Sequence, residues 1–209
     1  MVTIAAAILT GYLLGSIPTG VWLGKLFKGI DIRQHGSGSI GATNVSRVLG
    51  AKLAVIVLVI DVAKGFLACY LASRVNFGDI LLSGGQLSIL GGLAAVIGHL
   101  FPVFAGFRGG KGIATGAGIV LYISPLEVGF TVVVFISIAY LTRFVSLASI
   151  TAAIFYCLAI LVEKYYMGYP VDDEVAGLAI LLVIIVLCTH RSNIRRLMAG
   201  TENRFGAKK

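Results

Sequence analysis

Long apolar segments separated by short polar ones run through the whole chain. A helix needs about 20 mostly apolar residues to cross a lipid bilayer. By this measure we predict seven apolar helical segments, at residues 2–24, 52–73, 80–98, 112–123, 126–142, 146–163 and 175–189. The fourth is too short to cross alone at about 1.5 Å of rise per residue, so we expect a half-buried helix that follows a glycine-rich loop.

One of these helices has a clear expected start. Ser124, Pro125 and Glu127 place a hydroxyl at the N-cap, a proline at the first helical position and a carboxylate at the third. This combination predicts a capping box, in which the serine and glutamate side chains bind backbone amides of the first turn.

The composition is typical of a membrane protein. Of the 209 residues, 58% are hydrophobic and 12% are charged, against about 25% charged residues in a soluble domain. Twenty-seven glycines suit close packing between membrane helices. Cys69, Cys157 and Cys188 lie in apolar segments without metal-type spacing, so we expect interior packing rather than a disulfide or a zinc site. We therefore predict an all-α integral membrane protein with a single transmembrane domain, residues 1–209.

Basic residues are distributed unevenly over the predicted loops. Seven spans with the N-terminus outside would leave Arg74 and Lys164 on the outer side and fourteen basic residues on the inner side. The inner set is Lys25, Lys28, Arg33, Arg47, Lys52, Arg108, Lys111, Arg143, Arg191, Arg195, Arg196, Arg204, Lys208 and Lys209. Because cytoplasmic loops are enriched in Lys and Arg, we predict a seven-transmembrane-helix bundle with a cytoplasmic C-terminus, short interfacial helices and glycine-rich cytoplasmic loops.

The first of three polar stretches covers residues 36–47. It contains the spacing G-x-G-x-x-G, but a dinucleotide site also needs a preceding β-strand, and here an apolar helix precedes the loop. Glycines allow tight turns whose free amides can bind an anion, with polar partners from Ser37, Asn44 and Arg47. One face of a short helix is formed by Ala42, Val45, Val48 and Leu49. A flexible Gly/Ser loop before an interfacial helix is the simpler alternative.

The second polar stretch covers residues 98–115. From Gly106 to Gly110 it is one residue short of a P-loop, and Gly112 stands where Ser or Thr would bind magnesium, so we do not expect an ATP site. Consecutive glycine amides beside Arg108 and Lys111 at a helix entrance instead predict an anion site. For the nearby His99, we favour a structural hydrogen bond at a helix end.

The third polar stretch, residues 189–197, follows the last apolar segment. His190 and Asn193 are three residues apart and would share a helical face, with Arg191 and Arg195 on a neighbouring one. A basic tail held by anionic lipid explains the arginines well, but it does not explain the His/Asn pair.

Asp61 and Lys64 form an i, i+3 pair inside the second apolar segment. Ionisable residues at that depth are candidates for function, and we interpret this pair as a salt bridge that orients the inner side. A small transporter of an anionic solute, the alternative function, would use this pair near the bilayer midplane between two repeats. We find no such repeat. A scaffold for anionic lipid would explain the charge without explaining the glycines and histidines.

The three stretches together resemble the bacterial acyl-phosphate-dependent glycerol-3-phosphate acyltransferases, small proteins with seven spans and three cytoplasmic motifs. The matches follow the family order along nearly the whole chain: Gly36 to Gly38, Ile40 to Asn44, Arg47, Asp61, Lys64, Gly65, Gly98, His99, Phe101, Pro102, Gly109 to Gly112, Ser146 to Ser149, His190, Arg191, Asn193, Ile194, Arg196 and Leu197. Two positions depart from the family pattern, since Ser39 replaces its usual Asn and Arg108 its usual Lys. Both changes keep polarity or charge, so they bear on substrate affinity more than on reaction type.

The resemblance implies acyl transfer from an acyl phosphate to the sn-1 hydroxyl of glycerol 3-phosphate. This reaction would serve phospholipid biosynthesis at the bacterial inner membrane, with the active site facing the cytoplasm. The implied catalytic residues are Ser37, Arg47, Lys111, His190 and Asn193. The implied substrate-binding residues are Gly38, Asn44, Arg108, Gly109, Gly110, Gly112 and Ser146.

The residue types suggest how this chemistry would proceed. Lys111 and Arg47 would bind phosphate and developing charge, Ser37 and the glycine amides would form a phosphate or oxyanion nest, and Asn193 would position substrate. His190 would be a hydrogen-bond donor or the general base, with a substrate phosphate, of second pKa near ~6, as the rival base. A net charge of +8 would attract two anionic substrates. We expect no cofactor, no metal and no nucleic-acid partner, and a monomer surrounded by membrane lipid.

Overall fold

The computed structural model describes residues 1–79 and 82–206, and its regular elements are all helices. The chain divides into two compact units, Met1–Tyr122 and Ile123–Lys209, which we describe separately. Lys208 and Lys209, counted above among the inner basic residues, lie outside the described residues, as does the predicted start of the third apolar segment at residue 80.

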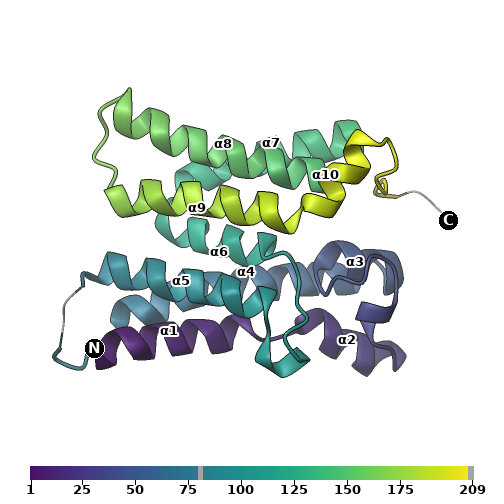
Figure 1. Cartoon of the computed structure of the whole chain (residues 1–209), viewed down its shortest axis with the longest axis horizontal. Helices are drawn as coiled ribbons and strands as arrows, with labels where there is room; N and C mark the ends of the chain where they lie inside the picture. Colours follow the sequence, from purple (N-terminus) through teal and green to yellow (C-terminus); the bar gives the residue numbers. More distant parts are fainter. Residues whose placement is uncertain (80–81, 207–209) are drawn as a thin grey trace. The chain divides into compact units, whose positions relative to one another are not determined.

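The first unit contains six α-helices and two short 3-10 helices among its described residues. They are α1 (Val2–Gly15), α2 (Thr19–Lys28), η1 (Ile32–Gln34), α3 (Ala42–Val48), α4 (Ala51–Arg74), α5 (Gly84–Leu100), η2 (Val103–Ala105) and α6 (Ile113–Ile123). The three longer helices α1, α4 and α5 pack against one another, and α1 runs along α5 (Figure 1).

Helices of the first unit approach one another at glycine positions. A Cβ atom at Gly15 of α1 would lie 2.0 Å from the carbonyl oxygen of Ala95 in α5. A Cβ at Gly118 of α6 would lie 2.0 Å from the carbonyl oxygen of Val62 in α4. Only a residue without a side chain lets the two backbones come so close, and this closeness is typical of helix pairs in membranes.

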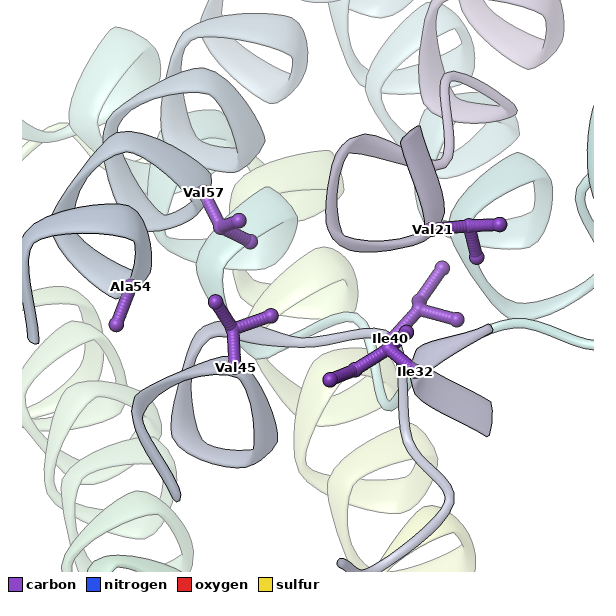
Figure 2. Packing of buried hydrophobic residues seen from close by; sticks show 6 residues of the cluster. All are labelled: Val21, Ile32, Ile40, Val45, Ala54 and Val57. Atoms are coloured by element: carbon purple, nitrogen blue, oxygen red, sulfur yellow. The ribbon is translucent and has the colours of Figure 1, made fainter. Parts of the chain in front are cut away.

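An apolar cluster joins the polar loops of this unit to its helices. Figure 2 shows Val45 of α3 facing Ala54 and Val57 of α4, while Ile32 and Ile40 lie near Val21 of α2. The predicted apolar face of the short helix is confirmed, since Ala42, Val48 and Leu49 pack against the same cluster. This cluster packs the loop between α2 and α3 against the helices α2, α3 and α4.

The second unit contains α7 (Pro125–Thr142), α8 (Val145–Tyr165), α9 (Asp173–Thr189) and α10 (Arg191–Met198). Helix α8 packs against both α7 and α9. Helices α9 and α10 meet at an angle of 63° (Figure 1). The chain after α10 turns back, and the amide of Phe205 donates to the carbonyl oxygen of Arg143 at 2.7 Å.

Most of the predicted apolar segments form membrane-length helices. Within the described residues, five helical segments are long and apolar enough to cross a membrane: Val2–Lys28, Ala51–Arg74, Gly84–Ala105, Pro125–Thr142 and Val145–Tyr165. The pair α9 and α10 would make a sixth if it counts as one broken span. Helix α6 has 11 residues, in agreement with the short fourth segment predicted above. The count of seven spans and the direction of the termini stay predictions.

The predicted capping box at Ser124 is wrong, although the helix does begin at Pro125. The hydroxyl of Ser124 makes no capping bond, and its oxygen instead lies 2.6 Å from the hydroxyl of Tyr156 in α8. A tertiary hydrogen bond has replaced the local one. A capping box does occur at the start of α5, where Ser83 and Gln86 bind each other's backbone amides.

Candidate active site

The first polar loop is organised around the side chain of Asn44. This residue is 1% exposed, and its Oδ1 accepts a hydrogen bond from the amide of Ser37 at 2.7 Å. Its Nδ2 lies 2.8–3.2 Å from three carbonyl oxygens of the same loop, those of Ile32, His35 and Ser39. Asn44, predicted to bind substrate, therefore holds the loop in shape from inside.

Glycine is required at two positions of this loop. Gly36 has a φ of 63° and Gly38 a φ of 73°, in the left-handed region that side chains disfavour. A Cβ at Gly36 would also lie 2.2 Å from Oδ1 of Asn44. The predicted tight turns are confirmed, and they leave Ser37 exposed between the two glycines.

We predicted that free backbone amides of this loop bind an anion. For three of these amides the prediction is wrong, because each already donates within the loop. The amide of Ser37 donates to Asn44, that of Gly38 donates to the carbonyl oxygen of His35 at 3.1 Å, and that of Gly41 to the hydroxyl of Ser39 at 3.3 Å. These three amides are therefore not free to bind an anion. The exposed polar side chains of this stretch include those of Ser37 and, on α3, Arg47.

The second polar loop lies against the last turn of α5. The amide of Gly110 donates to the carbonyl oxygen of His99 at 3.0 Å, so this amide too is used internally. A Cβ at Gly112 would lie 2.8 Å from a methyl carbon of Leu100. The backbone on both sides of Lys111 is therefore fixed on α5, and Lys111 itself is partly buried.

Arg33 joins the two loops of the first unit. Its guanidinium donates to the carbonyl oxygen of Ala105 in η2 at 2.5 Å and pairs with the carboxylate of Asp31 at 2.6 Å. The hydrogen bonds from Arg33 lower the pKa of Asp31 to about 2. This bond joins η1, just before residues 36–47, to η2, just before residues 106–112. From the sequence, Arg33 was predicted only as one of the cytoplasmic basic residues. The neighbouring acid Asp31 was the one local sign that Arg33 forms a specific ion pair.

The predicted salt bridge between Asp61 and Lys64 is confirmed. Its atoms are 2.8 Å apart and the two side chains are 2% and 3% exposed. Lys64 also donates to the carbonyl oxygen of Ile17 at 3.0 Å, in the short break between α1 and α2. A backbone acceptor that the break leaves without a helical partner is thereby satisfied.

His190 lies at the bend between α9 and α10, where it ends one helix and precedes the next. The prediction that His190 and Asn193 share a face of one continuous helix is therefore wrong. Both side chains are nevertheless buried. Nδ1 of His190 is 2.9 Å from the carbonyl oxygen of Val186. Because a carbonyl only accepts, Nδ1 carries a proton, and in the neutral ring Nε2 is the basic nitrogen.

Glu202 connects the remaining candidate residues of the second unit. Its Oε1 accepts from the Ser146 hydroxyl at 2.9 Å and from Nδ2 of Asn193 at 2.6 Å, and its Oε2 accepts from Arg196 at 2.7 Å. Burial alone would raise the pKa of Glu202, but these three donors outweigh burial and lower it. Glu202 is a single acid in a basic tail, and its role could not be predicted from the sequence.

The candidate residues fall into two groups, one in each unit. Arg47, Ser37, Gly38, Asn44 and the second loop belong to the first unit, whereas Ser146, His190 and Asn193 belong to the second. Apolar helices of membrane length, joined by polar segments rich in basic residues, define a multi-pass integral membrane protein.

The chain belongs to the glycerol-3-phosphate acyltransferase family, whose profile matches residues 5–200. Relatives named glycerol-3-phosphate acyltransferase occur in Fusobacterium nucleatum, 45% identical over 93% of this chain and 94% of the relative, and in Chlorobium phaeobacteroides, 41% identical over 98% and 97%. The protein is therefore an acyltransferase, as the motifs indicated.

Solved structures of an integral membrane glycerol 3-phosphate acyltransferase, PlsY (YgiH), have the same fold. The glycerol 3-phosphate form is 43% identical with a TM-score of 0.84, covering 97% of this chain and 96% of that one. The lysophosphatidic acid form is also 43% identical, with a TM-score of 0.82 and coverage of 97% and 95%.

Glu202→Gln should destabilise the protein at neutral pH, because it removes the charge that three donors bind. The pKa of Glu202 is lower in the folded state than its ordinary value of 4.5, so its contribution to stability is present above that value and is lost as the pH falls through the folded one. We expect a loss of about 1–3 kcal/mol at neutral pH. The difference in melting temperature between the variant and the wild type, measured in detergent, should shrink on acidification.

Asp172→Asn is the control for this titration. Asp172 is an exposed acid of the same unit, and its side chain makes no capping hydrogen bond at the start of α9. We expect little change in melting temperature. A Glu202→Gln effect that does not shrink anywhere in the acid range in which the wild type stays folded would show that the charge of Glu202 is not what stabilises the fold.

Proposed function

We propose that the protein transfers an acyl group from an acyl phosphate to the sn-1 hydroxyl of glycerol 3-phosphate. The hydroxyl oxygen bonds to the acyl carbon, the bond from that carbon to the phosphate oxygen breaks, and the products are 1-acyl-glycerol 3-phosphate (lysophosphatidic acid) and inorganic phosphate. The observation that carries the proposal is the pair of connected loops in the first unit, which bear Arg47, Arg108 and Lys111 for two phosphate-bearing substrates. A relative solved in glycerol 3-phosphate and lysophosphatidic acid forms supports the acceptor and the product.

Lys111 and Arg47 have the central electrostatic role in this proposal. Lys111 is partly buried, and the backbone before it is held against α5, which limits where its ammonium can lie. A fixed cation in such a place stabilises negative charge that develops on the leaving phosphate or on the acyl oxygen. Arg47 and Arg108 are exposed and suit capture of the phosphate groups from solution.

Ser37 supplies a hydroxyl donor in the first loop. Its own amide is used by Asn44, so the hydroxyl, presented between Gly36 and Gly38, is the group we assign to a substrate oxygen. The left-handed backbone conformation of Gly38 allows the chain to turn after Ser37, and the hydrogen bonds of Asn44 hold this turn in place. Gly109, Gly110 and Gly112 contribute by allowing the second loop to lie close to α5.

The residues of the second unit would handle the proton and the substrate position. In neutral His190, Nε2 is the basic nitrogen and can accept the proton of the attacking hydroxyl. An oxygen of a substrate phosphate, with a second pKa near ~6, is the rival acceptor. Glu202 fixes the amide of Asn193 and the hydroxyl of Ser146, which we assign to substrate positioning. An acyl phosphate is already activated, so orientation and charge stabilisation supply much of the rate.

The choice of donor tests this function directly. Purified wild-type protein in detergent should form lysophosphatidic acid from acyl phosphate and glycerol 3-phosphate, with release of one phosphate per turnover. Acyl-CoA should not replace acyl phosphate, because the sequence shows no motif for an adenine nucleotide. Product regiochemistry by NMR checks the sn-1 position. Comparable turnover with acyl-CoA would contradict the proposed donor, and uptake of phosphate esters into vesicles without acyl transfer would favour a transporter.

Lys111→Ala should be the most costly single change for turnover. Loss of a pre-organised charge partner typically lowers kcat about 100- to 1000-fold, and Lys111→Arg should retain more activity because it keeps the charge. Lys52→Ala is the matched control, since Lys52 is an exposed lysine at the start of α4. Melting temperatures in detergent check that each variant is folded. Wild-type kinetics in folded Lys111→Ala protein would remove Lys111 from the active site.

We also infer that the protein lies in the bacterial inner membrane with its N-terminus outside and its active site facing the cytoplasm. The uneven distribution of basic residues supports this orientation. Single cysteines at Ser39 and Ala199 should react with an impermeant thiol reagent only from the cytoplasmic side, and one at Asp173 only from outside. The background protein should lack Cys69, Cys157 and Cys188, because Cys188 is exposed. Reaction of the Ser39 and Asp173 variants from the same side would refute this topology.

A further inference from the structure

His99 is a buried histidine that lies between an ion pair and the second polar loop. It is the second-last residue of α5 and is 3% exposed. On one side its Nδ1 lies 3.8 Å from Oδ1 of Asp61. On the other side its Nε2 occupies space next to the backbone of Gly110. The hydrogen bond predicted for the His99 side chain is not found at Nδ1 within the described residues; only the backbone carbonyl oxygen of His99 accepts, from the amide of Gly110.

The ion pair of Asp61 and Lys64 lies near one edge of the ring. Asp61 is bound by Lys64, which is also bound to the carbonyl oxygen of Ile17, so the carboxylate has little freedom to move. At 3.8 Å the contact to His99 is too long for a hydrogen bond, and Nδ1 has no hydrogen-bond partner within the described residues. The attraction of the carboxylate still favours the orientation that turns a protonated Nδ1 toward Asp61. The opposite ring edge is then turned toward the loop.

The loop is shaped to fit this ring. A Cβ at Gly110 would lie 2.3 Å from Nε2 of His99 and 3.1 Å from its Cδ2. The φ of Gly110 lies outside the left-handed region, so its backbone conformation alone would tolerate alanine. Gly109 differs, because a Cβ there would lie 2.0 Å from the backbone oxygen of His99 and 2.5 Å from that of Leu100. The ring of His99 therefore requires glycine at position 110, whereas the backbone of α5 requires it at position 109.

We propose that His99 is a positioning residue for the acyl-transfer reaction. Its ring sets the distance between Gly110 and α5, and this distance determines where the Lys111 ammonium lies. This inference rests on the proposed function, in which Lys111 binds phosphate and developing charge. His99 itself touches no substrate in this scheme. A displacement of about 1 Å in a catalytic group can lower rate about 100-fold, so a small change in ring size is enough to be measured.

The proposal is tested by adding a methyl group at position 110 and making the side chain at position 99 smaller. Gly110→Ala should lower kcat/KM about 100-fold by lifting the loop off the ring. His99→Asn removes the ring edge that meets this methyl group but keeps a nitrogen near Asp61, so the double variant should recover activity about tenfold relative to Gly110→Ala, a normal coupling for residues in contact. His99→Gln should give no recovery, because its longer amide reaches the place of Nε2.

Two further variants separate positioning from folding. Gly109→Ala clashes with backbone, so His99→Asn should not restore it. Gly129→Ala in α7 is the neutral control, since no heavy atom lies within 4 Å of its added methyl group. Melting temperatures and the folded fraction should accompany all kinetics, with His99→Ala as the second small substitution if His99→Asn protein is unstable.

The readouts distinguish each outcome. In folded His99→Asn protein we expect a raised KM for a phosphate substrate together with a lower kcat, whereas a purely structural residue would reduce the active fraction and leave KM unchanged. Recovery of activity by His99→Asn in the Gly110→Ala background, but not in the Gly109→Ala background, supports the proposal. Absence of recovery in folded double variant, equal recovery of Gly109→Ala, or wild-type kcat and KM in His99→Asn would overturn it. Wild-type protein that lacks acyl transfer altogether would instead overturn the proposed function.

Discussion

Direct contact between backbones, allowed by glycine, is the constraint on which the first unit depends. Membrane helices gain little from the hydrophobic effect between themselves, so their association relies on close packing. Gly15 and Gly118 bring α1 against α5 and α6 against α4. The same principle continues beyond the helices, because Gly109 and Gly112 lay the second loop on α5. The place of Lys111 is thus a consequence of how the helices pack.

The polar segments are held by their own internal hydrogen bonds. Asn44 satisfies the first loop, and Glu202 satisfies the segment that contains Ser146 and Asn193. The first network uses the backbone amide of Ser37, and the second uses the side chains of Ser146 and Asn193. Both networks hold the segments in fixed conformations, which suits the electrostatic stabilisation by cationic side chains and hydroxyls in our proposal.

The sequence was sufficient for the all-helical membrane fold and the family, because apolar length and motif order are local properties of the chain. It was insufficient for interactions between distant residues. Glu202 stands in a basic tail and gives no local signal, although it binds Ser146, which is far away in the chain. Ser124 has the local pattern of a cap but bonds to Tyr156 instead. Amide use in the first loop was mispredicted because Asn44 could not be placed inside it.

The bond from Arg33 to the carbonyl oxygen of Ala105 has a consequence for how the chain can vary in length. Surface loops usually tolerate insertions, since a longer loop adds little entropy cost. Here a residue inserted between α2 and α3 would shift Arg33 away from η2, and one inserted before Ala105 would shift its acceptor. An insertion at either place would therefore cost the protein this hydrogen bond between the two loops, unless the other loop moved with it.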